Sequence, residues 1–269
     1  MSNEVVFGLV SVTFRHLPIE RVVALASEAG LEAIEWGGDV HVPHGDLAAA
    51  RRARRTCEAA GVGVYAYGSY YRAGRRDGAR ALSFESVLAT AVALGAPAIR
   101  VWAGGVGSAT ADQATRDAVA DDLARACDLA GGQGVGIDVE FHDDTLTDTA
   151  ASAVALADAV GRPNLRLGWQ PRHGFTVGQN LDDLAAIGPR LGNIHVFHWW
   201  PDHHTRLPLA EGIDRWAAYL EVAAADCIPR VAALEFVRGD GEAQFFDDAA
   251  SLRSLRASAR GARPRPSSK

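Results

Sequence analysis

The sequence predicts a single (β/α)8 barrel, and three observations lead to that fold class. Short runs rich in Val, Ile and aromatic residues recur eight times along the 269 residues. Segments with apolar residues at helical spacing lie between them, and several of these segments end at glycine. No G-x-G-x-x-G motif follows the first run, so closure into a barrel is favoured over an open, doubly wound sheet.

The predicted strands are separated by intervals long enough for a helix and its loops. Segments such as FESVLATAVALG and IDRWAAYLEVAAADC carry the helical spacing. Strands that alternate with helices form a parallel sheet with helical crossovers. The predicted strands are Val5–Val12, Ala33–Gly37, Val62–Ser69, Ala98–Trp102, Val135–His142, Asn164–Gln170, Asn193–Trp200 and Arg230–Val237.

The length suits one domain, because barrels of this class take about 250 residues. We expect the barrel to occupy residues 1–260 and the Pro- and Ser-rich residues 261–269 to form a disordered tail. The chain shows neither a signal-peptide pattern nor an apolar run of about 18 residues. We therefore expect a soluble, cytoplasmic protein with no membrane partner.

Composition excludes several classes of chemistry. The only lysine is Lys269, so no lysine is available for a Schiff-base aldolase, a pyridoxal-phosphate enzyme or a P-loop. The net charge of -6 argues against nucleic acid as a main partner. The three cysteines, Cys57, Cys127 and Cys227, form no C-x-x-C pair, which indicates a reduced protein with cysteines as small core residues.

Polar residues share one face of several predicted strands. Side chains alternate between the faces of a strand, and in 135–142 the residues Asp138, Glu140 and His142 alternate with apolar ones. The same alternation places Gln170 and Glu235 on the polar face of their strands. Polar side chains that point into a barrel near the strand C-termini are the usual layout of a barrel active site.

Histidines and tryptophans support the same location. All nine histidines and five of the six tryptophans lie in or just after the C-terminal ends of predicted strands, and the helical segments have few of either. They are His16, His41, His44, His142, His173, His195, His198, His203, His204, Trp36, Trp102, Trp169, Trp199 and Trp200.

Four inward positions at the ends of consecutive strands form a ring, namely Glu140, Gln170, His195 and Glu235. Neighbouring strands are about 4.8 Å apart, so these side chains can converge on one point. Two carboxylates, an imidazole and an amide suit one divalent cation, Mn²⁺, Mg²⁺ or Co²⁺, better than a thiolate-rich zinc site. The alternative is a set of buried ion pairs without a metal.

The segments VEFHDDTLTDT, NLRLGWQPRHG, LGNIHVFHWW and AALEFVRGD resemble the xylose-isomerase-like barrel superfamily, also described as AP-endonuclease-2-like. That superfamily contains sugar isomerases and epimerases, inosose dehydratases and endonuclease-IV-like proteins. In its ketose 3-epimerases Glu, Asp, His and Glu on the last four strands hold the metal. The resemblance therefore implies Glu140, Gln170, His195 and Glu235 as ligands, with Gln170 where Asp is usual.

The resemblance also implies substrate contacts and a choice of metals. His173 matches a substrate-contacting histidine of the epimerases. Their arginine downstream of the metal histidine is not matched, because Pro201 stands there, and Arg206 is the nearest substitute. We expect one Mn²⁺ or Mg²⁺ ion, with Co²⁺ or Zn²⁺ as alternatives.

The ring predicts proton abstraction beside a metal-bound carbonyl. A cation that holds two adjacent oxygens of a hydroxy-ketone acidifies the C–H between them and stabilises an enediolate. Glu140 and Glu235 are the predicted catalytic residues that remove and return the proton. Return to the opposite face gives an epimer, return to the neighbouring carbon gives an isomer, and loss of a β-substituent gives a lyase or dehydratase.

Further residues are predicted to contact the substrate. Glu35 points inward and can bond a hydroxyl, His142 shares the face of Glu140, and Trp102 can stack on a sugar ring. Arg238 can bind an anionic group. Asp240 would repel a phosphate, so a neutral sugar, a cyclitol or a keto-glycoside is the expected substrate.

Two other functions remain open at this point. His44, Asp202 and His204 could serve an endonuclease-IV-like trizinc site, although Gln170 and the acidic composition oppose that function. A non-catalytic binding subunit is the other alternative, because Gln170 weakens the metal site. A homo-oligomer is compatible with the sequence.

Overall fold

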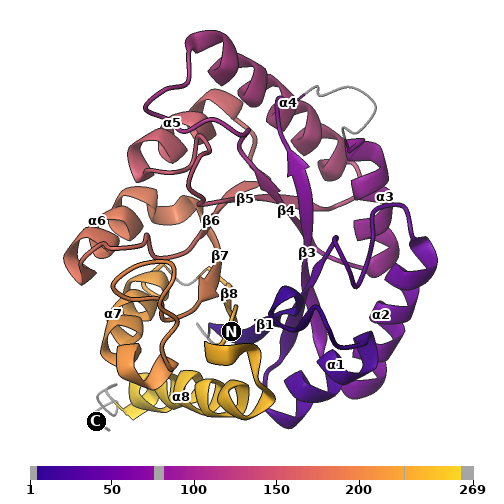
Figure 1. The fold of residues 1–269 in the computed structure, drawn as a ribbon. Coiled ribbons are helices and arrows are strands. Elements are labelled where there is room, and N and C mark those ends of the chain that lie inside the picture. Colours follow the sequence, from indigo (N-terminus) through magenta and orange to yellow (C-terminus); the bar gives the residue numbers. More distant parts are fainter. Residues whose placement is uncertain (1–4, 76–81, 227, 262–269) are drawn as a thin grey trace, which may run out of the picture.

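Eight parallel strands form a closed barrel in the computed structural model, which describes residues 5–75, 82–226 and 228–261. Neighbouring strands pair in sequence order, and the last pairs with the first to close the ring. Figure 1 shows this ring at the centre of the molecule with the helices outside it. The strands are β1 (Val6–Val10), β2 (Ala33–Gly37), β3 (Gly63–Arg72), β4 (Ala98–Trp102), β5 (Gly136–Glu140), β6 (Leu165–Trp169), β7 (Leu191–Val196) and β8 (Val231–Leu234).

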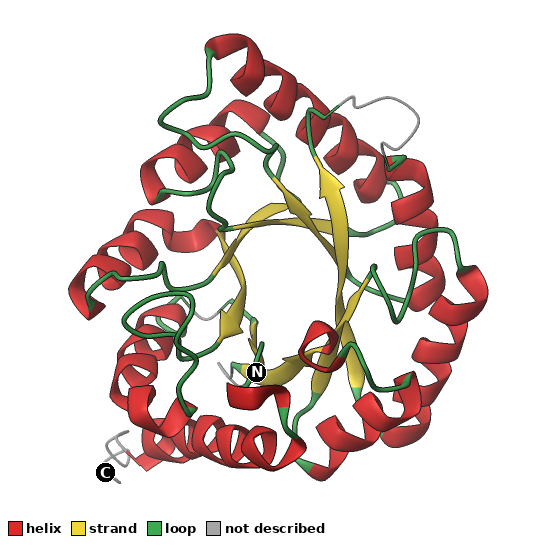
Figure 2. Cartoon of the chain, in the orientation of Figure 1, coloured by secondary structure: helices red, strands yellow, loops and turns green. Residues whose placement is uncertain are grey.

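An α-helix follows each strand, so the predicted (β/α)8 barrel is confirmed (Figure 2). The helix ends follow local rules. The side chains of Asp46 and Ser83 accept backbone N–H bonds in the first turns of α2 and α3, and Gly61 and Gly95 end these helices in the left-handed conformation. The helices are α1 (Ile19–Glu28), α2 (Leu47–Ala60), α3 (Phe84–Leu94), α4 (Gln113–Gly131), α5 (Ala150–Val160), α6 (Val177–Ile187), α7 (Ile213–Ala223) and α8 (Glu242–Gly261).

The strands β7 and β8 end three or more residues before the predicted ends of their apolar runs. The run expected to continue to Trp200 leaves the barrel after Val196, because Trp199 turns back to pair with Arg206 in an isolated antiparallel bridge. β8 ends at Leu234 because Phe236 has a φ of 55°, which a strand residue does not adopt. The last residues of both runs are mostly apolar but lie in loops. Hydrophobic periodicity alone does not distinguish such a loop from the end of a strand.

The apolar residues divide into two layers. The larger lies between strands and helices and includes Ile34, Val139 and Leu167, each 0% exposed. The smaller fills the barrel interior, as the alternation of side chains along the strands requires. It consists of Val10, Val12, Ala33, Tyr65, Ala66 and Ala233.

The structure also bears on the predictions for the cysteines, the C-terminal tail and the membrane. Cys57 and Cys127 are buried core residues, as predicted, and Cys227 lies outside the described residues. The tail from 262 onward also lies outside them, whereas Gly261 is the last residue of α8. Within the part of the chain that is described, no helix has the length and apolar character needed to cross a membrane.

Candidate active site

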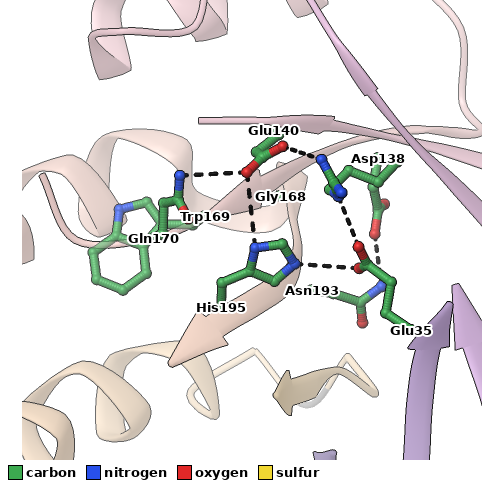
Figure 3. A pocket seen from close by; sticks show the side chains of 9 residues that line it. Glu35, Asp138, Glu140, Gly168, Trp169, Gln170, Asn193 and His195 are labelled. Atoms are coloured by element: carbon green, nitrogen blue, oxygen red, sulfur yellow. Dashed lines mark hydrogen bonds and ion pairs between the residues drawn. The ribbon is translucent and has the colours of Figure 1, made fainter. Parts of the chain in front are cut away.

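Buried charged residues gather where the strands end. Glu35 lies in β2, Arg100 in β4 and Glu140 at the end of β5, while His195 lies in β7 and Glu235 directly follows β8. Their exposed fractions run from 1% to 7%. Figure 3 shows Glu35, Glu140 and His195 pointing toward one another at a pocket. The pocket is lined by Glu35, Arg100, Asp138, Glu140, Gly168, Trp169, Gln170, Asn193 and His195.

Arg100 joins two of the carboxylates. Its Nε donates to Glu35 Oε1 at 2.7 Å, and its Nη1 donates to Glu140 Oε2. Burial alone would lower the pKa of Arg100, but the charges of Glu140 and Glu35 raise it well above its usual value. Burial likewise favours a higher pKa for Glu35, but Arg100 and His195 outweigh it and lower that pKa to about 2. Arg100 is not among the site residues predicted from the sequence, although its inward position in AIRVW was a usable signal.

His195 links three carboxylates through its two ring nitrogens. Nε2 lies 3.2 Å from Glu35 Oε2, and Nδ1 lies 3.2 Å from Glu235 Oε2 and 3.8 Å from Glu140 Oε1. Burial lowers the pKa of His195, but Glu235 and Glu35 more than offset this and raise it well above its usual value. The raised pKa favours the imidazolium form of the ring, in which both nitrogens carry a proton.

Glu140 is held by donors from three neighbouring elements. Trp102 Nε1 donates to Oε2, and Gln170 Nε2 donates to Oε1 at 3.4 Å. A second bond from Gln170 Nε2 to the Phe141 carbonyl, 2.6 Å long, orients the amide. Thr147 Oγ1 donates to the Glu140 carbonyl at 2.5 Å. The structure therefore brings the four predicted ring residues into one contact network through Glu140 and His195.

The backbone after β8 is strained where it presents Glu235. The Glu235 N–H donates to the Val196 carbonyl at 2.9 Å, which is the last link to β7. Phe236 then takes a positive φ of 55°, and its N–H donates to Thr13 Oγ1 at 3.1 Å. An aromatic residue in that region costs about 1–3 kcal/mol, and such strain concentrates at functional sites.

Trp102 and His142 form one wall beside Glu140. The indole N–H of Trp102 bonds Glu140, and its ring lies 5.1 Å from His142 and 5.5 Å from Tyr70 between centroids. The guanidinium of Arg72 stands 3.9 Å over the same ring. His142 Nδ1 lies 2.7 Å from the Asp143 carbonyl. Neighbours therefore cover much of the Trp102 ring, which was expected to stack on a sugar.

The remaining predicted contacts lie at different distances from this network. His173 is half-buried and stacks on Trp199, with 5.1 Å between centroids and 12° between planes. Its Nδ1 is buried and makes no hydrogen bond within the described ranges. Burial is the main cause that lowers the pKa of His173. Arg238 is exposed and donates to Gln244 Oε1 at 2.9 Å, so the structure does not bring it into the network.

A buried acid lies at the inner end of the pocket. Asp138 accepts a bond of 2.6 Å from Asn193 Nδ2. Burial raises the pKa of Asp138, and the Asn193 hydrogen bonds oppose that rise only in part. Strand alternation placed Asp138 on the polar face, but it was not selected as a site residue because nothing local indicated its partner.

The donor set allows a test of metal binding. No group of three or more His, Cys, Asp or Glu side chains in the described ranges stands arranged around one ion position. The donor chemistry nevertheless fits a divalent cation, because His195 Nδ1 faces Glu140 and Glu235 while Nε2 faces Glu35. A histidine that binds a metal through one nitrogen normally donates its other N–H to a carboxylate. Oxygen donors with one imidazole suit Mn²⁺ or Mg²⁺.

The chain belongs to the xylose isomerase-like TIM barrel family, whose sequence model matches residues 23–255. A 3-dehydroshikimate dehydratase from Bacillus anthracis is 30% identical over 98 residues, which cover 36% of this chain and 35% of that protein. The chain thus matches about a third of the length of this curated relative.

Solved structures have the same fold. The probable 3-DHS dehydratase from Bacillus anthracis has a TM-score of 0.75 and 19% identity, over 92% of this chain and 98% of that one. A D-psicose 3-epimerase has a TM-score of 0.68 and 17% identity, over 93% and 98%. A xylose isomerase-like TIM barrel protein from Mycobacterium smegmatis, in complex with magnesium, has a TM-score of 0.68 and 15% identity, over 96% and 99%. At these identities the likeness shows the fold alone.

Proposed function

We propose that this chain is a divalent-metal-dependent isomerase or epimerase of a sugar or sugar-like hydroxy-ketone. The observation that carries the proposal is the meeting of Glu140 and Glu235 at one nitrogen of His195, at the C-terminal end of the barrel. Two buried carboxylates at one point are suited to removing and returning a proton. The names of the relatives support the substrate class, since they include D-psicose 3-epimerase and L-ribulose 3-epimerase.

Glu140, Gln170, His195 and Glu235 are the proposed cation ligands. When bound there, Mn²⁺ or Mg²⁺ supplies Lewis-acid stabilisation of the charge that develops on two adjacent substrate oxygens. Gln170 is the neutral member of the set, and its bond to the Phe141 carbonyl holds its amide beside Glu140.

The protein side chains perform the proton transfer in this proposal. Arg100 and Trp102 both donate to Glu140 Oε2. Oε1 lies on the His195 side and has a bond of 3.4 Å from Gln170, and it is the oxygen proposed to take the proton. Glu235 approaches the same nitrogen from β8 and returns the proton. His142 and His173 are the proposed contacts to substrate hydroxyls, and the half-buried Trp102 helps to exclude water from Glu140.

A dehydratase is the second candidate, and the relatives give a specific reason for it. The curated relative is named as a 3-dehydroshikimate dehydratase, and one of the structural neighbours is named as a probable 3-DHS dehydratase. The first step is the same removal of a proton beside a carbonyl. The electron pair then forms a C=C bond while the β-hydroxyl leaves, and the removed proton completes a water molecule.

A proton-exchange screen tests both candidates. The protein with Mn²⁺ is incubated in D2O with ketoses, inososes, 3-keto-glycosides and 3-dehydroshikimate, and each is followed by ¹H NMR. Deuterium at the carbon beside the carbonyl, together with a new epimer or isomer, supports the isomerase. A new alkene signal supports the dehydratase instead. Absence of exchange with every compound, with and without Mn²⁺, contradicts both.

A further inference from the structure

A second, smaller cavity lies between the loops that follow β6 and β7 and the helices α6 and α7. It has room for a guest of about the size of a water molecule. Most of the described residues that line it are aromatic, two are arginines, and none is acidic. They are Pro171, Arg172, Phe175, Asn180, Phe197, His198, Trp199, Trp200, Arg215, Trp216 and Tyr219.

Arg215 brings an unpaired positive charge to this cavity. The side chain is half-buried, and its guanidinium carbon lies 4.0 Å from the centre of the Trp200 ring. It makes no hydrogen bond or ion pair with the residues that the structure describes. Arg172 differs, because its Nε and Nη2 donate to the carboxylate of Asp183 at 2.8 and 3.0 Å. A half-buried charge without a partner is costly, and an anion in the cavity would remove that cost.

Two neutral side chains of the lining also lack partners. Nε1 of Trp199 is buried and makes no hydrogen bond within the described ranges. His198 is 7% exposed, and its ring makes no hydrogen bond with the described residues either. Burial lowers the pKa of His198, and the charge of Arg215 lowers it further, so the ring is neutral and carries one N–H. The cavity therefore offers N–H donors and a full positive charge.

The start of α7 is shaped to hold the His198 ring. A Cβ on Gly212 would lie 2.6 Å from His198 Nδ1, so a larger residue at this position would displace the ring. Gly212 is the N-cap of α7, and no side chain caps this helix end, where the helix dipole adds partial positive charge. The neighbouring acids Glu211 and Asp214 are exposed and do not line the cavity.

We propose that this cavity binds a small monovalent anion, and that chloride is the ion that suits its size and its donors. The small size leaves out phosphate and sugars, and a water molecule in the same place would not offset the charge of Arg215. Trp199 stacks on His173, so the bound anion would also hold the ring against which this proposed substrate contact packs. The inference does not depend on the proposed metal centre.

Thermal unfolding of the full chain, without added metal, compares chloride with a bulky anion. Wild type should melt about 3 °C higher in sodium chloride than in the sodium salt of MES at equal ionic strength, because this sulfonate is too large for the cavity. Arg215→Gln should lose that difference. Arg116→Gln should keep it and is the matched control, since Arg116 is also half-buried and bonds the Ser108 carbonyl at 2.5 Å, away from the cavity.

Crystals of wild type grown in sodium bromide give a result that does not depend on any variant. An anomalous peak in the cavity, within hydrogen-bond distance of Arg215 and Trp199 Nε1, would support the proposal. Water alone in the cavity would overturn it. So would equal melting of wild type in the two salts, or an unchanged difference in Arg215→Gln. A bromide peak without the difference in melting would indicate an adventitious ion only, and would also overturn the proposal.

Discussion

The two halves of the barrel contribute different groups to the candidate site. The second half, β5 to β8, provides the proposed ligands and proton carriers, Glu140, Gln170, His195 and Glu235. The first half provides Glu35, Arg100 and Trp102, each of which bonds a residue of the second half. The proposed reacting groups thus lie in one half of the barrel, and the side chains that bond them and balance their charge lie in the other, as a preorganised site requires.

Charge balance explains why residues of the first half must accompany the buried carboxylates of the second half. Three carboxylates and two cations meet within the barrel, and all five side chains are at most 9% exposed. Buried charges are tolerated when they are paired and hydrogen-bonded, whereas removal of one partner is strongly destabilising. We therefore expect substitutions in the second half mainly to lower turnover and substitutions in the first half mainly to lower the free energy of unfolding.

The largest expected effect is loss of turnover in the second half. Glu140→Gln and Glu235→Gln should each lower kcat by about 10²–10⁴-fold, because an amide cannot accept the proton. Circular dichroism should show a retained fold, and activity is followed on whichever substrate the NMR screen identifies. Glu58→Gln is the matched control, since Glu58 lies on the surface in an i,i+4 pair with Arg54. Near-normal activity in either site variant would contradict the two-glutamate mechanism.

The next largest effect is a loss of stability in the first half. Arg100→Met leaves Glu35 and Glu140 without their shared cation and should lower the free energy of unfolding by about 3–5 kcal/mol at neutral pH. Arg54→Met, which breaks an exposed pair, should cost about 0.5 kcal/mol or less. Guanidinium denaturation measures both. Equal losses would show that the central arginine is not needed to offset the carboxylates.

The pH dependence of the same variant has a defined sign. In wild type the lowered pKa of Glu35, about 2, gives stability that is present above the unfolded pKa of about 4.3 and lost as pH falls through about 2. In Arg100→Met burial favours protonated Glu35, so stability should rise as pH falls from 7 to 5. Denaturation curves at these pH values check this. A fall in the stability of Arg100→Met over that interval would contradict the charge-balance explanation.

An intermediate effect is expected at the neutral ligand. Gln170→Asp restores a carboxylate beside Glu140 and should tighten Mn²⁺ binding by roughly tenfold, which corresponds to about 1.4 kcal/mol. Gln133→Asp changes the net charge equally at an exposed position in the turn before β5, and should leave the affinity unchanged. Calorimetry measures both variants. If the two behave alike, Gln170 is not a ligand.

The smallest effects concern the proposed substrate contacts. His173→Asn should raise KM by roughly tenfold if its unpartnered Nδ1 bonds the substrate. Arg238→Gln should change KM by less than about threefold, because Arg238 is exposed and bonds Gln244 on α8. Steady-state kinetics measures the KM of both variants and so distinguishes the two expected effects. A larger effect at Arg238 would place an anionic substrate group on that side of the barrel.

The sequence predicted those features that follow from a pattern repeated every few residues, such as the alternation of side chains along a strand. Strand alternation placed Asp138, Glu140 and Gln170 at the pocket, and all three line it. The predicted end of a strand was wrong where apolar residues lie in a loop, as at Trp199. Glu35 was selected as a substrate contact, but its oxygens are engaged by Arg100 and His195. Its partners lie 65 and 160 residues away in the chain, beyond the range of any local pattern.

The sequence by itself determined the barrel and the polar face of its strands, because both follow from periods of a few residues. Only the tertiary structure decided which charges meet. Strand register places Arg100 between Glu35 and Glu140, and a bulge in β3 turns Tyr65 into the barrel interior. These relations depend on barrel closure, which brings distant strands to one axis where water no longer screens their charges.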